Sequence, residues 1–467
     1  MIQASPRSDP PRTGYLLAAY GLAWKSALPV ISALARLDGA VRGALGRGCL
    51  PRNWRVTERL RIPTVAAGGP ETLWCHCASL GEAKGLWGLV RELMLDQSPL
   101  ADPFPFRIHL TANTAAGLDF LRRECEAFGI SAEASAGVPG IGTGMAPFDH
   151  PGLVRRFLIA LNVKAICIFE TELWPNYIRV GTDLGIPVSL VSARLTSKAL
   201  ALYRRYPRAA EAVIGRLAWI QAQSDLDRDR FRSFSQAPIT TGFDFKAAHY
   251  LRAGYFRGSG ASSAEGNAAG IGRSRIALIS LHVPELRLLL PELPALSDRF
   301  PIVVFPRHMR DLPAFRRLLE PLGFVLHSRD AQARNQLVDS MGQVGAILPS
   351  CHSALVGGSL IPSGCHNLWE PLLNGLKTYF GPEYGNQENL ARLLLEWGIA
   401  EVVSDIRTLR EWRVPGPEVM DACGLLWNAQ NHGLAGAIAE CRGRIFATFT
   451  NERRNAAVAT QMRGKEK

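Results

Sequence analysis

Paired cysteine spacing is missing from this chain of 467 residues. Its nine cysteines are odd in number, scattered, and without any C-x-x-C arrangement, which argues against a disulfide framework or a zinc knuckle and favours a reducing cytosolic compartment. Cys75, His76 and Cys77 are adjacent, but in a strand the two cysteines point to one face and the histidine to the other. We therefore predict a buried strand there, and no metal site.

The common nucleotide-binding glycine loops are missing as well. Neither glycine-rich stretch matches a Walker loop or a dinucleotide fingerprint, which disfavours ATP and NAD. Lys and Arg number 53 against 41 Asp and Glu, a net charge of +12, yet no basic block is interleaved with aromatic residues. A basic protein of this kind favours acidic lipid or a phosphorylated substrate as partner, and nucleic acid is the weaker interpretation.

A long uninterrupted hydrophobic run is also absent; the closest approach to one is the apolar segment 15–37. A spanning helix needs ~20 apolar residues, and a lysine such as Lys25 near its middle costs about 2.5–3.5 kcal/mol. We therefore expect residues 1–50 to hold a membrane-associated helix lying in the interface, with Tyr15, Tyr20 and Trp24 at headgroup level. A spanning helix, a secretory signal peptide and a buried terminal helix remain the alternatives.

What the sequence does contain is a repeated alternation of strand-like and helix-like segments. The strand-like segments of the first half are 72–79, 106–113, 164–170, 186–193 and 217–224. Those of the second half are 275–282, 300–308, 323–328, 353–360 and 376–382. A strand followed by a helix, repeated, predicts parallel sheets with crossover helices.

A stretch rich in Gly, Ser and Ala without periodicity, residues 251–274, separates the two halves and is typical of a linker or an insertion. We predict two doubly wound α/β domains, over residues 51–250 and 275–467, the second ending in helices. In such folds ligands bind at the carboxyl ends of the strands, and in a two-domain protein that means the cleft between the domains.

Polar residues follow five of the predicted strands directly. They are Ser79 to Glu82, Glu170 to Glu172, Ser192 with Arg194, Pro306 to His308, and Gly357 to Ser359. One such residue would mean little. Five at equivalent topological positions predict a single site.

Glu82 lies in the first turn of a helix expected to begin around Ala83. An acid there is stabilised by about 0.3–1 kcal/mol as a carboxylate, which would keep it ionised at neutral pH. The functional alternative is a general base facing the ligand. Glu170 and Glu172 would share one face of a strand and repel each other unless a cation or a substrate proton intervenes; capping and turn formation are the alternative.

The second half offers candidate anion-binding groups. Arg307 and His308 could hold a phosphate through bidentate hydrogen bonds, although a surface arginine is the simpler interpretation. A helix start near Met341 would present free backbone N–H groups. Asn367 and Glu370, three residues apart at a helix start, suit either a capping arrangement or a clamp on a ribose.

Together these motifs resemble the bacterial 3-deoxy-D-manno-octulosonic acid (Kdo) transferases, which add Kdo to a lipid A precursor. The resemblance extends from the apolar N-terminus to about Gly398 and depends on the shared order and spacing of the motifs. Its carriers are "ASLGE" (78–82), "TANTAAG" (111–117), "PFDHPGLVRRFL" (147–158), "ETELWPN" (170–176), "SARL" (192–195), "AQSDLDRDRF" (222–231), "PRH" (306–308), "VDSMGQ" (338–343), "VGGSLIPSGCHNLWEP" (356–371) and "FGPEYGN" (380–386).

The resemblance implies a GT-B fold, with residues 51–250 as the acceptor-side domain and 275–467 as the CMP-sugar-donor domain. It implies inverting transfer from CMP-Kdo without a metal or other cofactor. Glu82 would be the general base, and Glu170 and Lys246 would stabilise the transition state. CMP would be held by Pro306, Arg307, Met341, Gly342, Gln343, Asn367, Leu368, Trp369 and Glu370.

The implied partners are CMP-Kdo, a lipid A precursor (lipid IV-A) and the anionic surface of the inner membrane on its cytoplasmic face, with no nucleic acid. The chain departs from the family pattern mainly in the donor domain. Lys246 stands one residue farther from its glycine than usual, "SLHVPE" (280–285) lacks a threonine, and Gln343 replaces an acid. These departures leave two alternatives open: a GT-B paralogue using another nucleotide sugar on a lipid, or a catalytically silent homologue that binds lipid A.

Overall fold

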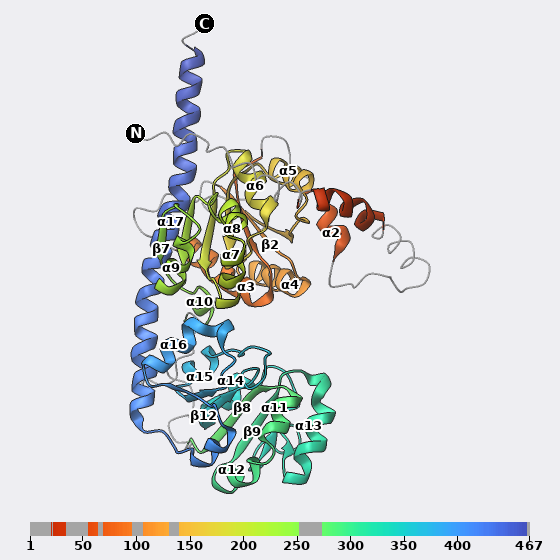
Figure 1. Ribbon diagram of the computed structural model, residues 1–467, viewed down its shortest axis with the longest axis vertical. Helices are drawn as coiled ribbons and strands as arrows, with labels where there is room; N and C mark the ends of the chain where they lie inside the picture. Colours follow the sequence, from red (N-terminus) through yellow and green to blue (C-terminus); the bar gives the residue numbers. More distant parts are fainter. Residues whose placement is uncertain are drawn as a thin grey trace. The chain divides into compact units, whose positions relative to one another are not determined.

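The computed structural model describes residues 20, 22–33, 55–63, 69–95, 106–129, 140–251 and 273–464. The chain divides into two compact units (Figure 1). The first holds Met1–His249 and Gly433–Lys467, and the second holds Tyr250–His432. Each unit is built on its own parallel sheet, so the predicted pair of doubly wound α/β domains is confirmed.

The first sheet has seven strands in the order β3-β2-β1-β4-β5-β6-β7. Their bounds are β1 Thr72–Cys77, β2 Arg107–Ala112, β3 Ile141–Met145, β4 Val163–Phe169, β5 Val188–Ala193, β6 Trp219–Ala222 and β7 Ile239–Thr241. β1 is buried along its whole length because it lies between β2 and β4 and is covered on both faces. The strand order reverses between β1 and β4, and such a reversal opens a crevice at the carboxyl ends of the two strands.

The helices of this unit are α2 Val56–Leu60, α3 Leu80–Leu95, α4 Ala115–Ala127, α5 Pro151–Ala160, α6 Pro175–Asp183, α7 Ser197–Arg205, α8 Pro207–Ile214, α9 Asp225–Arg232 and α10 Lys246–Leu251. Short polar side chains fix where several of them begin. Thr114, Thr196 and Ser224 each accept a backbone N–H of the first turn, and proline occupies the first turn of α5, α6 and α8.

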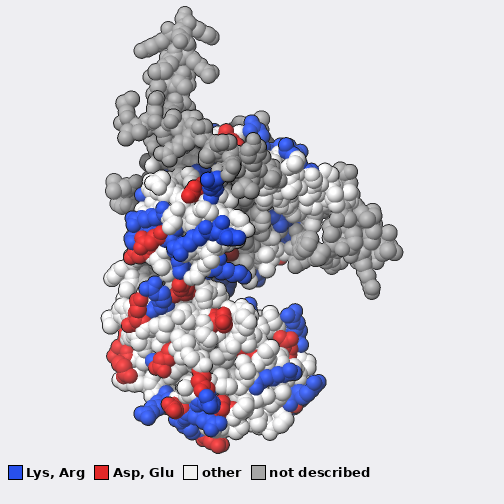
Figure 2. Space-filling view, viewed as in Figure 1, with Lys and Arg blue, Asp and Glu red and all other residues white. Residues whose placement is uncertain are grey.

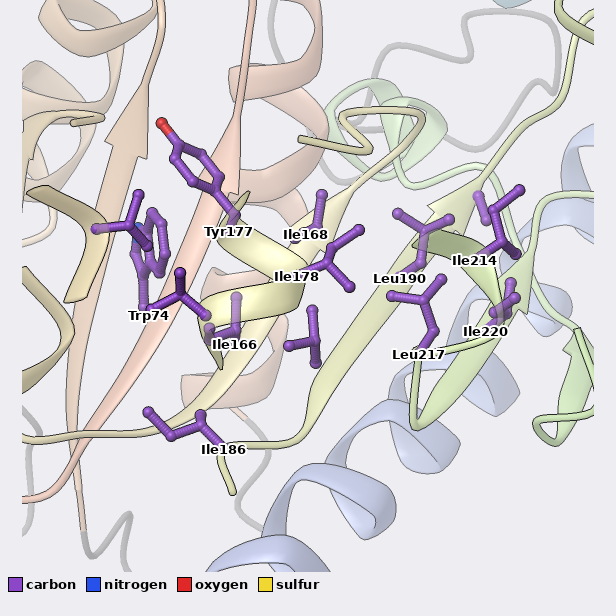
Figure 3. Packing of buried hydrophobic residues seen from close by; sticks show 14 of the residues in the cluster. Trp74, Ile166, Ile168, Tyr177, Ile178, Ile186, Leu190, Ile214, Leu217 and Ile220 are labelled. Atoms are coloured by element: carbon purple, nitrogen blue, oxygen red, sulfur yellow. The ribbon is translucent and has the colours of Figure 1, made fainter. Parts of the chain in front are cut away.

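One face of the first sheet packs against these helices through a continuous apolar cluster (Figure 3). Trp74 from β1 and Ile168 from β4 meet Tyr177 and Ile178 from α6, and all four are fully buried. The ring centroids of Trp74 and Tyr177 lie 5.0 Å apart. This packing anchors β4 and α6, and therefore the loop between them that carries the predicted acidic residues.

The second sheet has seven strands in the order β10-β11-β9-β8-β12-β13-β14. Their bounds are β8 Arg275–Leu281, β9 Ile302–Pro306, β10 Val325–Leu326, β11 Gln336–Leu337, β12 Cys351–Val356, β13 Lys377–Phe380 and β14 Ala400–Val402. Helices α11 Val283–Leu289, α12 Leu293–Arg299, α13 Leu312–Leu319, α14 Val344–Ile347, α15 Trp369–Leu373 and α16 Glu388–Glu396 surround it, with the 3₁₀ turns η2 Met309–Asp311, η3 Glu320–Leu322, η4 Leu348–Ser350, η5 Gly385–Gln387 and η6 Ile406–Glu411. Its strand order reverses between β8 and β12, which makes this the second switch point.

The long helix α17, Pro417–Gly464, changes the expected domain boundary. We expected residues 275–467 to form one domain, but from Gly433 onward the helix belongs to the first unit. The ring of Phe449 stacks on Phe106 with centroids 3.9 Å apart, and the Arg444 guanidinium lies 5.0 Å from the Trp219 ring. Apolar and basic residues of α17 therefore contact residues of the first unit, and these contacts could not be predicted from the sequence pattern alone.

The N-terminal prediction is tested only in part. Residues 22–33 are helical, while most of segment 1–50 and residues 252–272 of the predicted linker lie outside the described residues. The Tyr20 hydroxyl donates to Asp149 at 2.9 Å, and the centroids of the Trp24 and Phe148 rings are 6.0 Å apart. Tyr20 and Trp24 thus contact other residues of the first unit, and the position of this helix at a membrane surface stays a prediction. Within the described part of the chain, no helix is long and apolar enough to cross a bilayer.

Candidate active site at the first switch point

Glu82 and Glu170 follow the two strands that flank the first switch point. Glu82 lies in the first turn of α3, directly after β1, and Glu170 is the first residue after β4. Because β1 and β4 are parallel neighbours, their carboxyl ends meet at one edge of the sheet. The sequence prediction that these two strand ends belong to one site is therefore consistent with the topology.

Glu82 is held by its own helix start. One carboxylate oxygen accepts the backbone N–H of Ala78 at 2.7 Å, and the other accepts the Ser79 hydroxyl at 3.1 Å. Two donors on a partly buried carboxylate restrict its rotation. The side chain is thereby fixed in the position of a helix-start acid, as predicted, and its oxygens remain close to the switch point.

The charge state of Glu82 differs from our expectation. Burial, and then the carboxylate of Glu170, raise its pKa to about 7, while the backbone hydrogen bond from Ala78 opposes this shift. The helix start therefore does not keep Glu82 fully ionised at neutral pH. Desolvation and the like charge of Glu170 outweigh the hydrogen bond from Ala78. General base catalysis favours a pKa near neutrality.

Glu170 does not continue the strand. Its backbone φ is +59°, in the left-handed region, so β4 ends at Phe169 and the expected strand pairing of Glu170 with Glu172 on one face is wrong. The left-handed residue turns the chain sharply and directs the side chain into the protein, where only 4 % of it is exposed. A strained conformation at a strand end is a common feature of functional sites.

Lys246 supplies the cation that the acidic pair required. Its ammonium forms an ion pair with Oε1 of Glu170, and its side chain keeps 27 % exposure. Lys246 is the first residue of α10, and its backbone N–H donates to Asp244 at 3.0 Å. The extra residue between Gly242 and Lys246 therefore does not prevent the lysine from reaching the carboxylate.

The loop before Lys246 is held by Ser192, which was predicted as a polar residue after its strand, and by Gln221, which sequence reasoning did not single out. The Ser192 hydroxyl accepts the N–H of Phe245 at 3.2 Å, and Gln221 accepts the Ser192 N–H at 2.7 Å. A Cβ on Gly242 would lie 1.6 Å from the Gln221 amide nitrogen, so only glycine fits there. Gln221 is a buried polar residue of an apolar strand, which is the sequence signal that could have revealed it.

Asp244 is a third acid at this site, beside Glu82 and Glu170. Burial raises its pKa, Glu170 adds to the shift, and Lys246 and Arg194 oppose it. Arg194 is therefore close enough to contribute, as predicted from its place after β5. The site thus combines three carboxyl groups with two cationic side chains in partly desolvated surroundings.

Helix α3 approaches this loop closely because Gly85 has no side chain. A Cβ on Gly85 would lie 2.7 Å from Cζ of Phe169 and 3.1 Å from the backbone nitrogen of Lys246. This one glycine therefore sets the spacing between the helix that carries Glu82, the strand end before Glu170, and the start of α10.

Glu172 belongs to a neighbouring hydrogen-bond network. It accepts from the Trp174 indole at 2.6 Å and from Asn113 at 3.4 Å, and Asn113 in turn accepts from Arg59 at 3.0 Å. Burial and the charge of Glu170 raise its pKa, while these donors oppose the shift. Glu172 is thus a turn residue stabilised by side-chain donors, in agreement with the structural alternative offered for it.

The Cys-His-Cys sequence lies inside β1, as predicted. Cys75, His76 and Cys77 are all buried, and His76 faces Thr111 with 3.0 Å between Nδ1 and the hydroxyl. Burial, followed by the positive charge of Arg59, lowers the pKa of His76 to about 3, so it stays neutral. Among the described residues, no group of three or more His, Cys, Asp or Glu side chains is arranged to hold a metal ion.

In the second unit, Pro306 ends β9 and Arg307 follows it with an exposed side chain. The backbone N–H of Arg307 donates to Leu281 at the end of β8, at 2.9 Å, so the two strand ends are tied together. Gly357 also lies at this edge, where a Cβ would be 2.6 Å from the carbonyl oxygen of Ser280. Arg307 therefore stands beside the second switch point, open to a ligand.

The turn 341–343 is less regular than predicted. Gly342 has φ +83° and Met341 is 71 % exposed, so these residues form a turn, and α14 begins only at Val344. The helix start expected near Met341 and Gly342 therefore lies two to three residues farther along the chain, at Val344. Gln343 precedes α14 and has no side-chain capping hydrogen bond.

Asn367 to Glu370 lie at the start of α15, as predicted. The Asn367 side chain accepts the N–H of Trp369 at 3.1 Å, and Leu368 is fully buried beneath them. Glu370 lies in the first turn, and its carbonyl accepts from Asn374 at 2.8 Å. The N-cap residue of α15 is Leu368, which makes no side-chain capping hydrogen bond, so this contact is a turn just before the helix, and the capping arrangement of Asn367 with Glu370 stays a prediction.

Basic side chains gather on one part of the first unit. In the view of Figure 2, Lys and Arg form a band over the region of α7 to α9, with acidic groups among them. The last turns of α7 and α9 carry four of these arginines, namely Arg204, Arg205, Arg230 and Arg232. α7 has no buried residue, and Leu202 on it is 56 % exposed, so basic and apolar groups share this surface.

Comparison with known proteins gives consistent matches over most of the chain. The family model described as 3-deoxy-D-manno-octulosonic-acid transferase (kdotransferase) matches residues 54–248. The 3-deoxy-D-manno-octulosonic acid transferase of Bordetella pertussis is 28 % identical over 77 % of this chain and 83 % of its own length. That of Haemophilus influenzae is 26 % identical over 72 % of this chain and 76 % of its own.

Among solved structures, a putative UDP-N-acetylglucosamine 2-epimerase from Listeria monocytogenes covers 83 % of this chain and 98 % of its own, with 14 % identity and a TM-score of 0.49. The C-terminal CMP-Kdo binding domain of WaaA from Acinetobacter baumannii covers 36 % of this chain and 88 % of its own, with 24 % identity and a TM-score of 0.27. The sequence matches confirm the resemblance that the motifs showed.

Proposed function

We propose that this chain, a glycosyltransferase of the Kdo transferase family, transfers Kdo from CMP-Kdo to a hydroxyl of a lipid A precursor with inversion at the anomeric carbon. The observation that carries the proposal is the arrangement at the first switch point. Glu82 has a pKa of about 7, and beside it Lys246 is paired with Glu170.

Glu82 would act as the general base. An inverting transfer needs one group that removes the proton of the acceptor hydroxyl while the sugar is displaced from its phosphate. Ser79 and Ala78 fix the carboxylate in place, so it does not have to be ordered when the acceptor arrives. Because the pKa of Glu82 is about 7, a substantial fraction of this side chain is unprotonated at neutral pH. Its carboxylate also binds the proton of the acceptor hydroxyl more tightly than a glutamate of ordinary pKa would.

Lys246 and Glu170 would stabilise charge near the reacting carbon. Removal of the acceptor proton and departure of the phosphate both move negative charge, and a fixed ammonium in a partly desolvated site interacts strongly with it. Glu170 holds that ammonium in one position through the ion pair. The pair therefore serves to position a cation, which no flexible surface lysine would do.

Arg307 would bind the phosphate of the donor. Pro306 at the end of β9, and Met341, Gly342 and Gln343 in the turn before α14, would help to hold CMP. Asn367, Leu368, Trp369 and Glu370 would hold the nucleoside from the start of α15. We propose that no metal takes part. A nucleoside monophosphate leaving group carries less charge than a diphosphate, and Arg307 supplies positive charge for it from the protein.

The surface chemistry supports a lipid acceptor and an association with a membrane. A net charge of +12 and the shared basic and apolar surface of α7 suit a phosphorylated, acylated molecule in an anionic leaflet. We therefore propose an association with the cytoplasmic face of the inner membrane, with a lipid A precursor as acceptor.

A transfer assay tests the proposal directly. Purified full-length chain is incubated with CMP-Kdo and a tetraacyl lipid A precursor, and the product is identified by mass spectrometry. Transfer that disappears with Glu82→Ala supports the mechanism. Transfer that survives this substitution would refute Glu82 as the base.

A second candidate is a transferase of the same fold that uses another nucleotide sugar, and Gln343, in place of the acid usual in the family, is the observation that favours it. Thermal shift assays separate the two candidates. Stabilisation by CMP but not by UDP or GDP supports Kdo transfer, while stabilisation by UDP or GDP alone would favour the other donor.

A further inference from the structure

Phe243 is a buried aromatic residue in the loop that carries Lys246. The loop leaves β7 at Gly242 and ends where α10 begins, at Lys246. Only 4 % of Phe243 is exposed, and Phe245 is buried completely. Loops usually lie on the surface, so two buried rings in so short a loop indicate that it is held in one conformation.

The ring of Phe243 meets a second ring and a helix. It lies edge-to-face with the ring of Phe245, with the centroids 5.9 Å apart and the planes at 73°. On α17, a Cβ at Gly433 would lie 3.5 Å from Cδ2 and 3.9 Å from Cε2 of Phe243. The edge of this ring therefore faces the helix at a position that has no side chain.

The part of α17 that faces Phe243 is anchored to the first unit. Gly433 is the first residue of the helix that belongs to this unit. Buried side chains follow it at the spacing of one helix face, namely Leu434, Ala437, Ile438, Cys441 and Ile445. Because these side chains fix the helix, Gly433 presents a backbone of fixed position to the ring.

The backbone of the loop is tied to the end of β5. The Ser192 hydroxyl donates to the carbonyl of Phe243 at 3.4 Å and accepts the N–H of Phe245 at 3.2 Å. Ser192 is fully buried and has φ +53°, in the left-handed region. One hydroxyl thus fixes the backbone on both sides of Asp244, and the side chain of Phe243 fixes the same loop from the side of α17.

These contacts explain how a loop one residue longer than the family pattern still brings Lys246 to Glu170. The added length does not bulge into solvent, because Phe243 packs inward. Oδ1 of Asp244 then accepts the N–H of Lys246 at 3.0 Å, at the start of α10. From this helix start the ammonium of Lys246 reaches Glu170.

We propose that Phe243 is a positioning residue for Lys246. Its ring, set against α17, holds the loop so that the ammonium stays on Glu170, near Glu82. Phe243 acts through the loop and has no group that could exchange a proton or bind an anion. The link to transfer rests on the proposed function, whereas the position of the ammonium can be measured without it.

Acetylation of the full chain measures the position of Lys246 directly. Sulfo-N-hydroxysuccinimide acetate reacts with a lysine at Nζ, and the ion pair with Glu170 occupies this atom. The rate at Lys246 is followed by peptide mass spectrometry and divided by the rate at Lys377, whose own ion pair with Glu401 lies in the second unit. Phe243→Ala should raise this ratio about threefold or more, because the loop loses its contact with α17 and the ion pair opens.

Three further variants separate positioning from stability. Phe243→Leu keeps a δ carbon toward α17 and should leave the ratio close to that of the natural chain. Phe243→Val lacks this carbon but keeps more of the buried side chain than alanine, so it should raise the ratio even where Phe243→Ala does not fold. Phe234→Ala is the matched control, because Phe234 is 5 % exposed and belongs to the apolar cluster of the same unit. It should lower the free energy of unfolding and leave the ratio unchanged.

The pH dependence of transfer connects the position of Lys246 to the reaction. Glu170 and Glu172 raise the pKa of Glu82, and Lys246 lowers it. When the ammonium leaves its place in Phe243→Ala, the acid limb of kcat/KM should therefore move to higher pH. A purely structural loss leaves this limb where it is.

An unchanged acetylation ratio in folded Phe243→Ala or Phe243→Val would overturn the inference, and so would an equal rise in Phe234→Ala. A rise confined to these two Phe243 variants, with an acid limb at higher pH, supports it. If the natural chain showed no transfer but the ratio rose in Phe243→Ala and not in Phe234→Ala, the positioning of Lys246 would stand and the proposed function would be refuted.

Discussion

Lys246 forms an ion pair with Glu170, whose backbone φ of +59° turns the chain at the end of β4. The two residues stand 76 positions apart in the sequence, as their numbers show. They meet because β4 is at the centre of the sheet and α10 begins directly after the edge strand β7 and its loop. This relationship gives the acidic site its cation, and several predictions depend on it.

Replacement of Glu82 by glutamine should abolish most of the transfer activity. Glutamine keeps the size of the side chain and can still accept the hydrogen bonds from Ala78 or Ser79, but it cannot take a proton. General base catalysis contributes about 10²–10⁴-fold, so kcat should fall by roughly that factor. The measurement is steady-state transfer from CMP-Kdo with a lipid A precursor, together with a thermal denaturation curve.

Glu126→Gln provides the control for this change, because Glu126 is an exposed acid on α4. It should retain full activity. A Glu82→Gln protein that is folded and keeps more than about a tenth of the natural kcat would contradict a role for Glu82 as base.

The pH dependence of transfer should show one acid limb with a midpoint near 7. The base acts only when deprotonated, and the pKa of Glu82 is about 7, so kcat/KM should rise as the pH increases through 7 and then level off. The measurement is kcat/KM between pH 5.5 and about 8.5, a window set by that pKa.

Two substitutions should move this midpoint in opposite directions. Glu172 raises the pKa of Glu82 and Lys246 lowers it. Glu172→Gln should therefore shift the limb to lower pH, and Lys246→Met should shift it to higher pH, in addition to lowering the rate. Shifts of the same sign in both variants would show that Glu82 is not the titrating group.

Loss of Lys246 should also destabilise the fold. Lys246→Met leaves the buried carboxylate of Glu170 without its cation, and breaking a fully buried pair costs about 3–5 kcal/mol. The lysine side chain keeps 27 % exposure, so water partly screens the pair and we expect a loss of roughly 1–3 kcal/mol. The free energy of unfolding in urea, measured for the first unit's transition, checks this value.

The double variant Lys246→Met with Glu170→Gln tests whether the unpaired charge of Glu170 causes the loss of stability. It removes the uncompensated charge, so part of the stability should return although activity stays low. If the double variant were as unstable as the sum of the two single variants, the ion pair would not be the source of the effect.

The central strands could be predicted from the sequence because their apolar runs are long. β1 and β5 lie within the segments expected for them, and β4 begins one residue before its segment, at Val163. β3, with the sequence IGTGM, and the three-residue strand β14 were missed because glycine and short length leave no apolar pattern. Such edge strands form by pairing with a neighbouring strand, so their own residues do not predict them.

The site residues were found by their position after strands, but their energetics were not. The position of Glu82 predicted a helix-start carboxylate, yet its pKa depends on burial and on Glu170, which is distant in sequence. The roles of Gln221 and Asp244 depend on the loop between β7 and α10, whose path no local pattern specifies. The pKa of Glu82 and the roles of Gln221 and Asp244 thus depend on tertiary contacts, which a local sequence pattern does not contain.

The glycines of α3 give a test of the packing that joins the site together. A methyl group at Gly85 would lie 2.7 Å from Phe169 and 3.1 Å from the nitrogen of Lys246, so Gly85→Ala must displace the strand end before Glu170 or the start of α10. Overpacking of this kind costs about 1–3 kcal/mol, and we expect a loss of that size in the free energy of unfolding, with a lower kcat.

Gly81→Ala is the matched control in the same helix, since a Cβ there would meet only the Ser79 hydroxyl oxygen, at 3.9 Å. Alanine has a higher helix propensity than glycine by up to about 1 kcal/mol, so this variant should be as stable as the natural chain or more stable. Urea unfolding of the two variants side by side makes the comparison. Equal stability of Gly85→Ala and Gly81→Ala would show that α3 does not depend on a bare backbone at Gly85 for its contact with Phe169 and Lys246, and the fixed spacing inferred for the site would then be wrong.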